Sequence, residues 1–224
     1  MIAYTWFVAG FFIAFVVVHT LVLVFATAGL RRYTARVKVT SLRRVLRSPL
    51  APRISILVPA YNEAAGIVDS VRSLLALDYP QLEVVVISDG STDATIQTLI
   101  ESFELHRSRK VMPPHLSCQP VRAVYTPRGQ LRLLVIDKDN GGKADSLNTG
   151  INFASYPLVC SVDADSILEQ DALAKAALPF IEDPQRTVAT GGLIRVANGC
   201  RIERGRVAET HLPRSALSSR CSAR

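Results

Sequence analysis

The chain of 224 residues is long enough for one ordinary domain and a short extra segment, and its formal charge at pH 7 is +7. Residues 1–53 carry eight basic and no acidic residues, whereas residues 54–200 carry seventeen acidic against twelve basic residues. A mildly acidic central domain argues against a nucleic-acid-binding protein, so nucleic acid is not an expected partner.

The first segment of the chain is a candidate membrane anchor. Ile2 to Leu30 contains no Asp, Glu, Lys or Arg. At ~1.5 Å per residue, a helix of this length exceeds the roughly 30 Å hydrocarbon core of a bilayer. The run is also longer than the about 7–15 apolar residues of a signal peptide, and no basic residue precedes it. Residues 1–30 are therefore expected to form a transmembrane helix.

Basic residues follow the apolar segment directly. They are Arg31, Arg32, Arg36, Lys38, Arg43, Arg44, Arg47 and Arg53. By the positive-inside rule this end of the helix faces the cytoplasm. This predicts a single-pass protein of the inner cell membrane with its main domain in the cytoplasm. The linker at 31–53 is expected either to contact anionic membrane lipid or to be a solvated connection.

Between residues 54 and 200, short apolar runs alternate with amphipathic stretches. Strands are expected at 54–59, 82–88, 131–137, 157–162 and 187–196, and helices at 66–77, 92–103, 143–153 and 170–181. This alternation predicts an α/β domain with a mainly parallel sheet and helices on both faces. Residues 105–130 interrupt it. A hairpin of 121–125 with the next strand is expected there. The whole segment 105–130 is either a tolerated surface insertion or part of a membrane or acceptor site.

Polar residues follow four of the expected strands. The four stretches are Pro59-Ala60-Tyr61-Asn62-Glu63, Ser88-Asp89-Gly90-Ser91-Thr92-Asp93, Asp137-Lys138-Asp139-Asn140-Gly141-Gly142-Lys143 and Asp163-Ala164-Asp165. Because ligands of an open parallel sheet bind beyond the carboxyl ends of its strands, these residues should share one site. A single Asp at a strand end is often a helix N-cap, as we expect for Asp93, but four strand ends favour a ligand.

This combination of side chains suits a nucleoside diphosphate bound with a divalent cation. Carboxylates accept hydrogen bonds from ribose hydroxyls and from a ring N–H, and an aspartate can bind Mg²⁺ or Mn²⁺. A lysine attracts phosphate. A dinucleotide-binding domain would instead need Gly-x-Gly-x-x-Gly after its first strand, and neither this motif nor a Walker A loop occurs.

The ordered motifs VPAYNEAAGI, VVVISDGSTDAT, DKDNGGKADSLNTG and CSVDADSIL resemble those of family 2 glycosyltransferases with the GT-A fold, over residues 54–199. The likeness is greatest to processive membrane polysaccharide synthases such as the poly-N-acetylglucosamine synthases. It implies inverting sugar transfer from a UDP-sugar, expected to be UDP-N-acetylglucosamine, to a growing polysaccharide acceptor. The cofactor implied is Mg²⁺ or Mn²⁺.

The resemblance also implies roles for individual residues. Pro59, Tyr61 and Glu63 would line the uridine pocket. Asp89 would recognise the uracil ring, and Lys143 would lie near uracil and phosphate. The last motif would place Asp163 on the ribose and Asp165 on the metal. Ser88 departs from a position that is commonly acidic or an amide in the family.

The family's catalytic base is expected well beyond the strand at 187–196. It is an Asp in a Glu-Asp or Thr-Glu-Asp motif, and no such motif follows that strand here. Residues 201–224 resemble out-of-frame or early-terminated sequence. The GT-A domain at 54–200 is therefore expected to be incomplete, with no catalytic residue within this chain and no transfer activity of its own. The alternative is a non-catalytic membrane protein that binds nucleotide sugars.

Overall fold

The computed structural model describes residues 2–36, 51–110, 115–129, 131–192, 202–203 and 206–207. The chain divides into two compact units, Met1–Arg44 and Val45–Arg224. Most of the expected linker at 31–53 and most of the tail at 201–224 lie outside the described residues.

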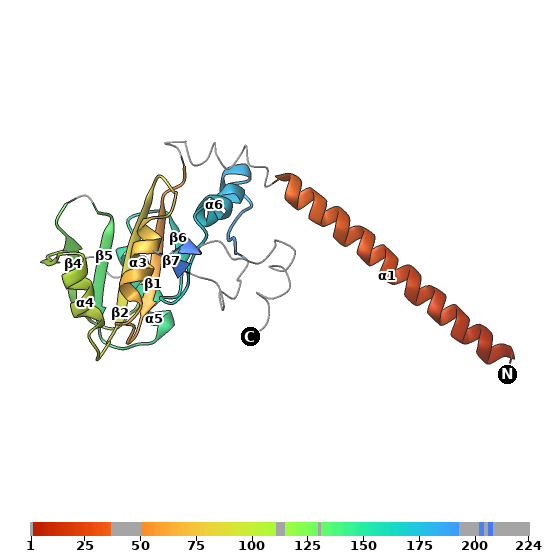
Figure 1. Cartoon of the computed structure of the whole chain (residues 1–224), viewed down its shortest axis with the longest axis horizontal. Coiled ribbons are helices and arrows are strands. Elements are labelled where there is room, and N and C mark those ends of the chain that lie inside the picture. The colour runs from red at the N-terminus through yellow and green to blue at the C-terminus, as the bar shows by residue number, and fades with distance from the viewer. Residues whose placement is uncertain are drawn as a thin grey trace. The chain divides into compact units, whose positions relative to one another are not determined.

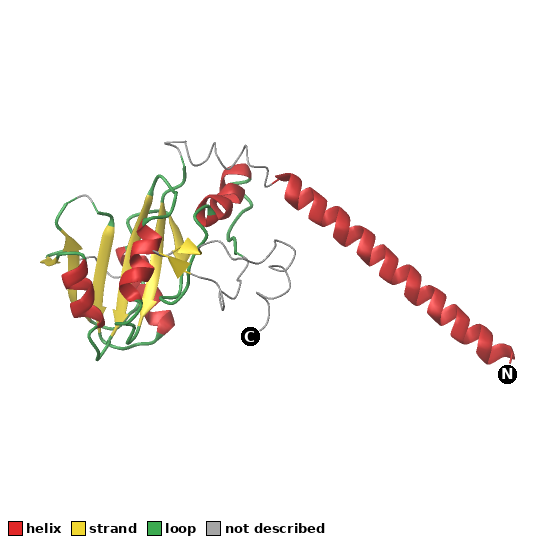
Figure 2. Ribbon diagram, in the orientation of Figure 1, coloured by secondary structure: helices red, strands yellow, loops and turns green. Residues whose placement is uncertain are grey.

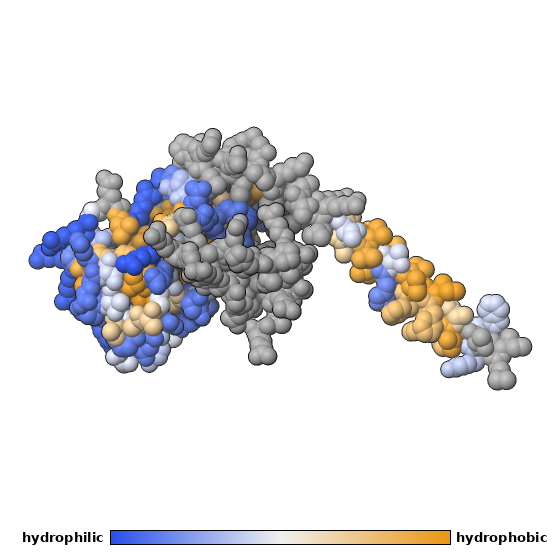
Figure 3. Space-filling view, in the orientation of Figure 1, coloured by the Kyte–Doolittle hydropathy of each residue, from blue (hydrophilic) through white to orange (hydrophobic). Residues whose placement is uncertain are grey.

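The first unit contains one long helix, α1 (Ile2–Arg36). Its stretch Trp6–Gly29 is long and apolar enough to cross a membrane, by length and composition, and none of it is buried inside the protein. The surface of this stretch in Figure 3 is predominantly apolar. At ~1.5 Å per residue it is ~36 Å long, which exceeds the roughly 30 Å hydrocarbon core of a bilayer.

The second unit is built on a six-stranded sheet in the order β3-β4-β5-β2-β1-β6 (Figures 1 and 2). The strands are β1 (Ile54–Ala60), β2 (Leu82–Asp89), β3 (Leu105–Ser108), β4 (Val121–Pro127), β5 (Leu133–Lys138) and β6 (Leu158–Ser161). β5, β2, β1 and β6 are parallel, whereas β3 pairs with β4 and β4 with β5 in antiparallel fashion. β7 (Ile202–Glu203) and β8 (Arg206–Val207) form a separate pair. The mainly parallel sheet confirms the predicted α/β class.

Helices cover both faces of the sheet, as predicted. They are α3 (Ile67–Leu75), α4 (Thr95–Ser102) and α5 (Lys143–Phe153), whereas α6 (Ala172–Glu182) follows β6. α3 connects β1 to β2, whereas α5 leads from β5 back across the sheet to β6. Because parallel crossovers are right-handed, connections in opposite directions put their helices on opposite faces. Figure 1 shows α3 and α4 together on the face nearer the viewer.

The apolar core has one layer on each face of the sheet. One layer joins α5 to the sheet through Leu57, Val85, Ile87, Val124, Leu134, Ile136 and Phe153. Because side chains alternate along a strand, the buried residues between these face α3 and α4. They are Ile56, Val58, Val84, Val86 and Val135. β1, β2 and β5 are therefore buried on both faces, whereas β6 at the sheet edge is not.

The structure differs from the predicted strands in two places. Residues 105–130 contain β3 and β4, so the interruption adds two strands to the sheet edge, and the expected hairpin with β5 is confirmed. The strand expected at 187–196 is wrong over 187–192, and 193–196 lie outside the described residues. The hydroxyls of Thr187 and Thr190 donate to the carbonyls of Pro179 and Ala176, so this segment is bonded to α6 instead of to a strand.

Candidate functional site

The four polar motifs lie at one edge of the sheet because the four parallel strands end there. β1 ends at Ala60, β2 at Asp89 and β5 at Lys138. β6 ends at Ser161, two residues before Asp163. The register pairs Asp89 directly with Lys138. The predicted gathering of the motifs at one edge is therefore observed.

The loop after β1 is joined to the loop after β2 by Asn62. Its Oδ1 accepts hydrogen bonds from the backbone amides of Thr92, at 2.8 Å, and Asp93, at 3.3 Å. In the other direction, the amide of Ala64 donates to Asp93 Oδ2 at 3.1 Å. Side chains of each loop thus hold the backbone of the other.

Asp93 lies two residues before α4 and bonds to the first residue of that helix. Its Oδ1 accepts hydrogen bonds from the hydroxyl and the amide of Thr95, the first residue of the helix. The bond from the Thr95 hydroxyl is the main cause that holds the pKa of Asp93 below its usual range. The N-cap residue is Ala94, so the expectation that Asp93 is the N-cap of this helix is wrong.

The carboxylate of Asp89 accepts three hydrogen bonds. Oδ1 accepts from Lys138 Nζ at 2.6 Å and from the amide of Gly141 at 3.0 Å, and Oδ2 accepts from the amide of Gly142 at 2.7 Å. Burial raises the pKa of Asp89, but these bonds and the charge of Lys138 outweigh burial and hold it below its usual range. A carboxylate has about four acceptor positions, so about one remains for a ligand.

Lys138 is fully buried, and its ammonium group lies between two carboxylates. Nζ is 2.6 Å from Asp89 Oδ1 and 2.6 Å from Asp145 Oδ2, and it also donates to the carbonyl of Asp139. Burial lowers the pKa of Lys138, but the hydrogen bonds with Asp145 and Asp89 outweigh it and raise the pKa above its usual value. Asp89, Lys138 and Asp145 form a charged group, here called the buried triad, that the sequence did not lead us to expect.

Lys143 and Asp163 are brought together by the structure. Lys143 is the first residue of α5, and its Nζ lies 2.5 Å from Asp163 Oδ1, with both side chains more than half exposed. Val162 and Ala164 are buried, so the alternation turns Asp163 and Asp165 outward. The Asp165 side chain has no hydrogen-bond or ion-pair partner in the part of the chain that the structure describes.

The three remaining predicted residues lie on and after β1. Pro59 is half-buried within the strand, and the Tyr61 side chain is exposed beyond it. Glu63 is half-buried, and its amide donates to Thr95 Oγ1 at 2.9 Å. Among the described residues, no hydrogen bond joins these three side chains to Lys143 or Asp163.

The outward Asp163 and Asp165 are the acidic pair that could hold a divalent cation. Within the described residues, no group of three or more His, Cys, Asp or Glu could hold a metal ion by itself. Mg²⁺ is usually bound through one or two carboxylates together with substrate phosphates and water, so a pair of exposed carboxylates fits a metal that arrives with a diphosphate. Such an ion would stabilise the negative charge of a leaving diphosphate.

One face of α5 holds the irregular segment 115–120 that borders the site. Asn152 Oδ1 accepts the amides of His115 and Leu116, Asn148 Nδ2 donates to the carbonyl of Ser117, and Asp145 accepts the amide of Gln119. Positions 145, 148 and 152 share a helix face, since they are three and seven residues apart. We call these three side chains the α5 polar ladder.

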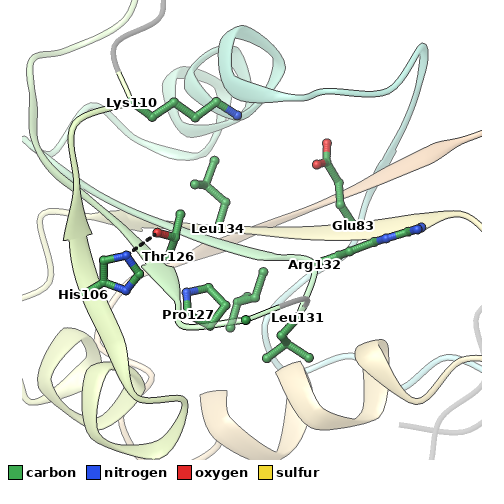
Figure 4. A pocket seen from close by; sticks show the side chains of 10 residues that line it. Glu83, His106, Lys110, Thr126, Pro127, Leu131, Arg132 and Leu134 are labelled. Atoms are coloured by element: carbon green, nitrogen blue, oxygen red, sulfur yellow. Dashed lines mark hydrogen bonds between the residues drawn. The ribbon is translucent and has the colours of Figure 1, made fainter.

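A separate hollow of about 380 Å³ lies away from the carboxylates. It is lined by Glu83, His106, Lys110, Thr126, Arg132 and Leu134, among others (Figure 4). Its strand residues come from the start of β2, β3 and β5 and the end of β4, which is the opposite edge of the sheet. The hollow is therefore distinct from the candidate site.

The sequence profile described as "Glycosyl transferase family 2" matches residues 55–113 and 119–215. The chain belongs to glycosyl transferase family 2. Its domain is thus a glycosyltransferase domain, and family membership together with the mainly parallel sheet confirms the GT-A class that the motifs implied.

Curated relatives in this family are named poly-beta-1,6-N-acetyl-D-glucosamine synthase. One from Staphylococcus epidermidis is 32% identical over 138 residues, and one from Staphylococcus aureus (strain COL) is 32% identical over 139 residues. Each match covers 62% of this chain and 28% of the relative. The chain therefore spans little more than a quarter of the length of these family members.

Solved structures of similar glycosyltransferases include S. aureus TarS (residues 1–349) and the mannosyltransferase PcManGT from Pyrobaculum calidifontis in complex with GDP-Man and Mn²⁺. TarS is 28% identical, with 58% of this chain and 32% of TarS covered and a TM-score of 0.43. PcManGT is 28% identical, with 62% and 37% covered and a TM-score of 0.44.

Proposed function

We propose that this family 2 domain binds a UDP-sugar, with UDP-N-acetylglucosamine as the donor, for inverting transfer to a growing polysaccharide at the inner face of the cell membrane. The observation that carries the proposal is the gathering of four strand-end motifs, with Lys143 and Asp163 in contact, at one edge of the sheet. The curated relatives named as poly-N-acetylglucosamine synthases support the choice of sugar.

The proposed donor site uses the residues implied by the family motifs. Pro59, Tyr61 and Glu63 line the uridine pocket, and the open acceptor position of Asp89 serves the uracil N–H. Asp163 accepts from the ribose. Lys143 then turns from Asp163 to the diphosphate, since ammonium groups bind phosphate oxygens well.

Asp165 is the proposed ligand of Mg²⁺ or Mn²⁺. Its exposed and unpaired carboxylate in the described part of the chain supports this role. The Lys143–Asp163 contact also supplies a reason for a metal, because a diphosphate that meets one lysine beside two carboxylates is short of positive charge.

We assign no residue of this chain as the base that deprotonates the acceptor. The outward carboxylates at 163 and 165 are committed to ribose and metal on the donor side. We therefore expect this chain, incubated alone with UDP-N-acetylglucosamine and Mg²⁺, to bind the donor without forming polymer. Polymer above the level of an Asp165→Ala control would contradict that expectation.

The donor site is tested by calorimetric titration of the detergent-solubilised chain with UDP. We expect Mn²⁺ to tighten UDP binding, and Asp165→Ala to remove the Mn²⁺-dependent part, a loss of at least tenfold or about 1.4 kcal/mol. Asp78→Ala is the matched control, because Asp78 is an exposed acidic residue in the turn before β2, at the opposite edge. UDP affinity that is equal with and without Mn²⁺, in both wild type and Asp165→Ala, would reject the metal assignment.

A further inference from the structure

We propose that Lys138 is a positioning residue of the donor site: through the buried triad it fixes the Gly141–Gly142 turn and thereby the place of Lys143. The inference rests on the proposed donor function of that edge. Lys138 is 0% exposed, so it cannot itself touch a donor, and any effect it has on binding must act through its neighbours.

The triad joins the ends of two neighbouring strands to the helix that follows. Lys138 is the last residue of β5, Asp89 the last residue of β2, and Asp145 lies in the first turn of α5. A buried ammonium group is costly unless its charge is matched, and both carboxylates lie within 2.6 Å of it. Removing Lys138 would leave two buried or half-buried carboxylates facing each other.

The charge balance of the triad depends on backbone amides. Two carboxylates exceed one ammonium by a single negative charge. Asp89 accepts the amides of Gly141 and Gly142, and Asp145 accepts the amide of Gln119. These amides stabilise the excess negative charge of the two carboxylates. The carboxylates that neutralise Lys138 therefore also hold the Gly141–Gly142 turn and the 115–120 segment in place.

The turn is closely packed at Gly141. A Cβ on Gly141 would lie 2.6 Å from Asp145 and 2.8 Å from the side chain of Gln119. At Gly90, with φ of +70°, a Cβ would lie 2.8 Å from the amide nitrogen of Asn140. Lys143 follows this turn directly, so the place of its ammonium group depends on the triad.

The inference is tested on the full chain in detergent by two measurements, UDP affinity by calorimetry with Mn²⁺ and segmental hydrogen exchange by mass spectrometry without ligand. We expect Lys138→Met to weaken UDP binding at least tenfold and to speed exchange in 115–120 and 139–143. Leu105→Ala is the control for lost stability, because it removes a buried side chain from β3 at the opposite edge. It should lower the melting temperature but leave UDP affinity within about twofold.

The outcomes separate the two proposals. Absence of UDP binding in the wild-type chain rejects the donor function. If the wild-type chain binds UDP and a folded Lys138→Met protein binds it equally well, only the positioning role is rejected. The same holds if Lys138→Met loses no more UDP affinity than Leu105→Ala. If Lys138→Met does not fold, Asp145→Asn decides, because it leaves Lys138 paired with Asp89 at balanced charge. We then expect faster exchange in 115–120 and weaker UDP binding, and wild-type values for both would overturn the inference.

Discussion

Asn62 occupies the turn after β1 with a left-handed backbone, at φ of 57°. Asn tolerates this conformation better than most side chains because its short amide can bond locally. Here the amide oxygen instead bonds across to the loop after β2, at the amides of Thr92 and Asp93. One residue thus supplies both an unusual backbone angle and the connection between two loops of the proposed donor site.

The two contributions of Asn62 can be separated by substitution. Asn62→Gly keeps the left-handed backbone but removes the acceptor, and we expect it to cost about 1 kcal/mol of unfolding free energy. Asn62→Ala removes the acceptor and also strains the backbone, which adds about 1 kcal/mol. Urea denaturation measures both, and UDP affinity should fall in the same order. Equal stability of the two variants would show that the turn can change its conformation.

At the scale of elements, α5 organises both the site and its border. Its first turn contributes Lys143 and Asp145, and its polar ladder holds the 115–120 segment. Asn152 makes the most of these bonds, since it accepts two amides and donates to the carbonyl of Leu116, and it is only 4% exposed. The interrupted part of the sequence is therefore bound to the domain by a helix that follows it in the chain.

The ladder predicts a graded effect of substitution. Asn152→Ala leaves three backbone groups of the 115–120 segment without partners, and we expect a loss of about 2–3 kcal/mol and faster tryptic cleavage after Lys110. Asn148→Ala removes one solvent-exposed hydrogen bond of a half-buried side chain and should cost less than about 1 kcal/mol. Cleavage rates that do not differ between the two variants would contradict the ladder's role.

The strand ends could be predicted from the sequence because buried parallel strands have continuous apolar runs, and such strands end at one edge. The triad was missed because a lysine after an apolar run is ordinarily exposed. A signal was present: Leu134, Ile136 and Lys138 alternate on one face of β5, which is the face that α5 covers. β3 was missed because only four residues pair there and two of them, His106 and Arg107, are polar and exposed.

At the scale of the whole molecule, the sequence order of apolar helix, basic residues and glycosyltransferase domain predicts one orientation. Arg31, Arg32 and Arg36 close the helix α1, and no acidic residue balances them before the domain begins. The positive-inside rule then predicts a cytoplasmic domain, where nucleotide sugars would reach the proposed donor site.

A reporter fused to the C-terminus tests this orientation. We expect a fluorescent protein that matures only in the cytoplasm to be active there, and alkaline phosphatase, which needs the periplasm, to be inactive. Changing all eight basic residues of 31–53 to glutamine and adding two lysines before Ile2 should shift both signals in the opposite sense. Phosphatase activity from the unmodified chain would contradict the predicted topology.

The strand β6 pairs with β1 and with no other strand that the structure describes. Its Val159 side chain is 48% exposed, and the strand contains no charged residue or proline. An edge of this kind is a template on which a second copy can extend the sheet. The consequence is that the folded domain can aggregate through β6, to an extent that rises with its concentration. A charged residue at position 159 is the smallest change that would oppose this association.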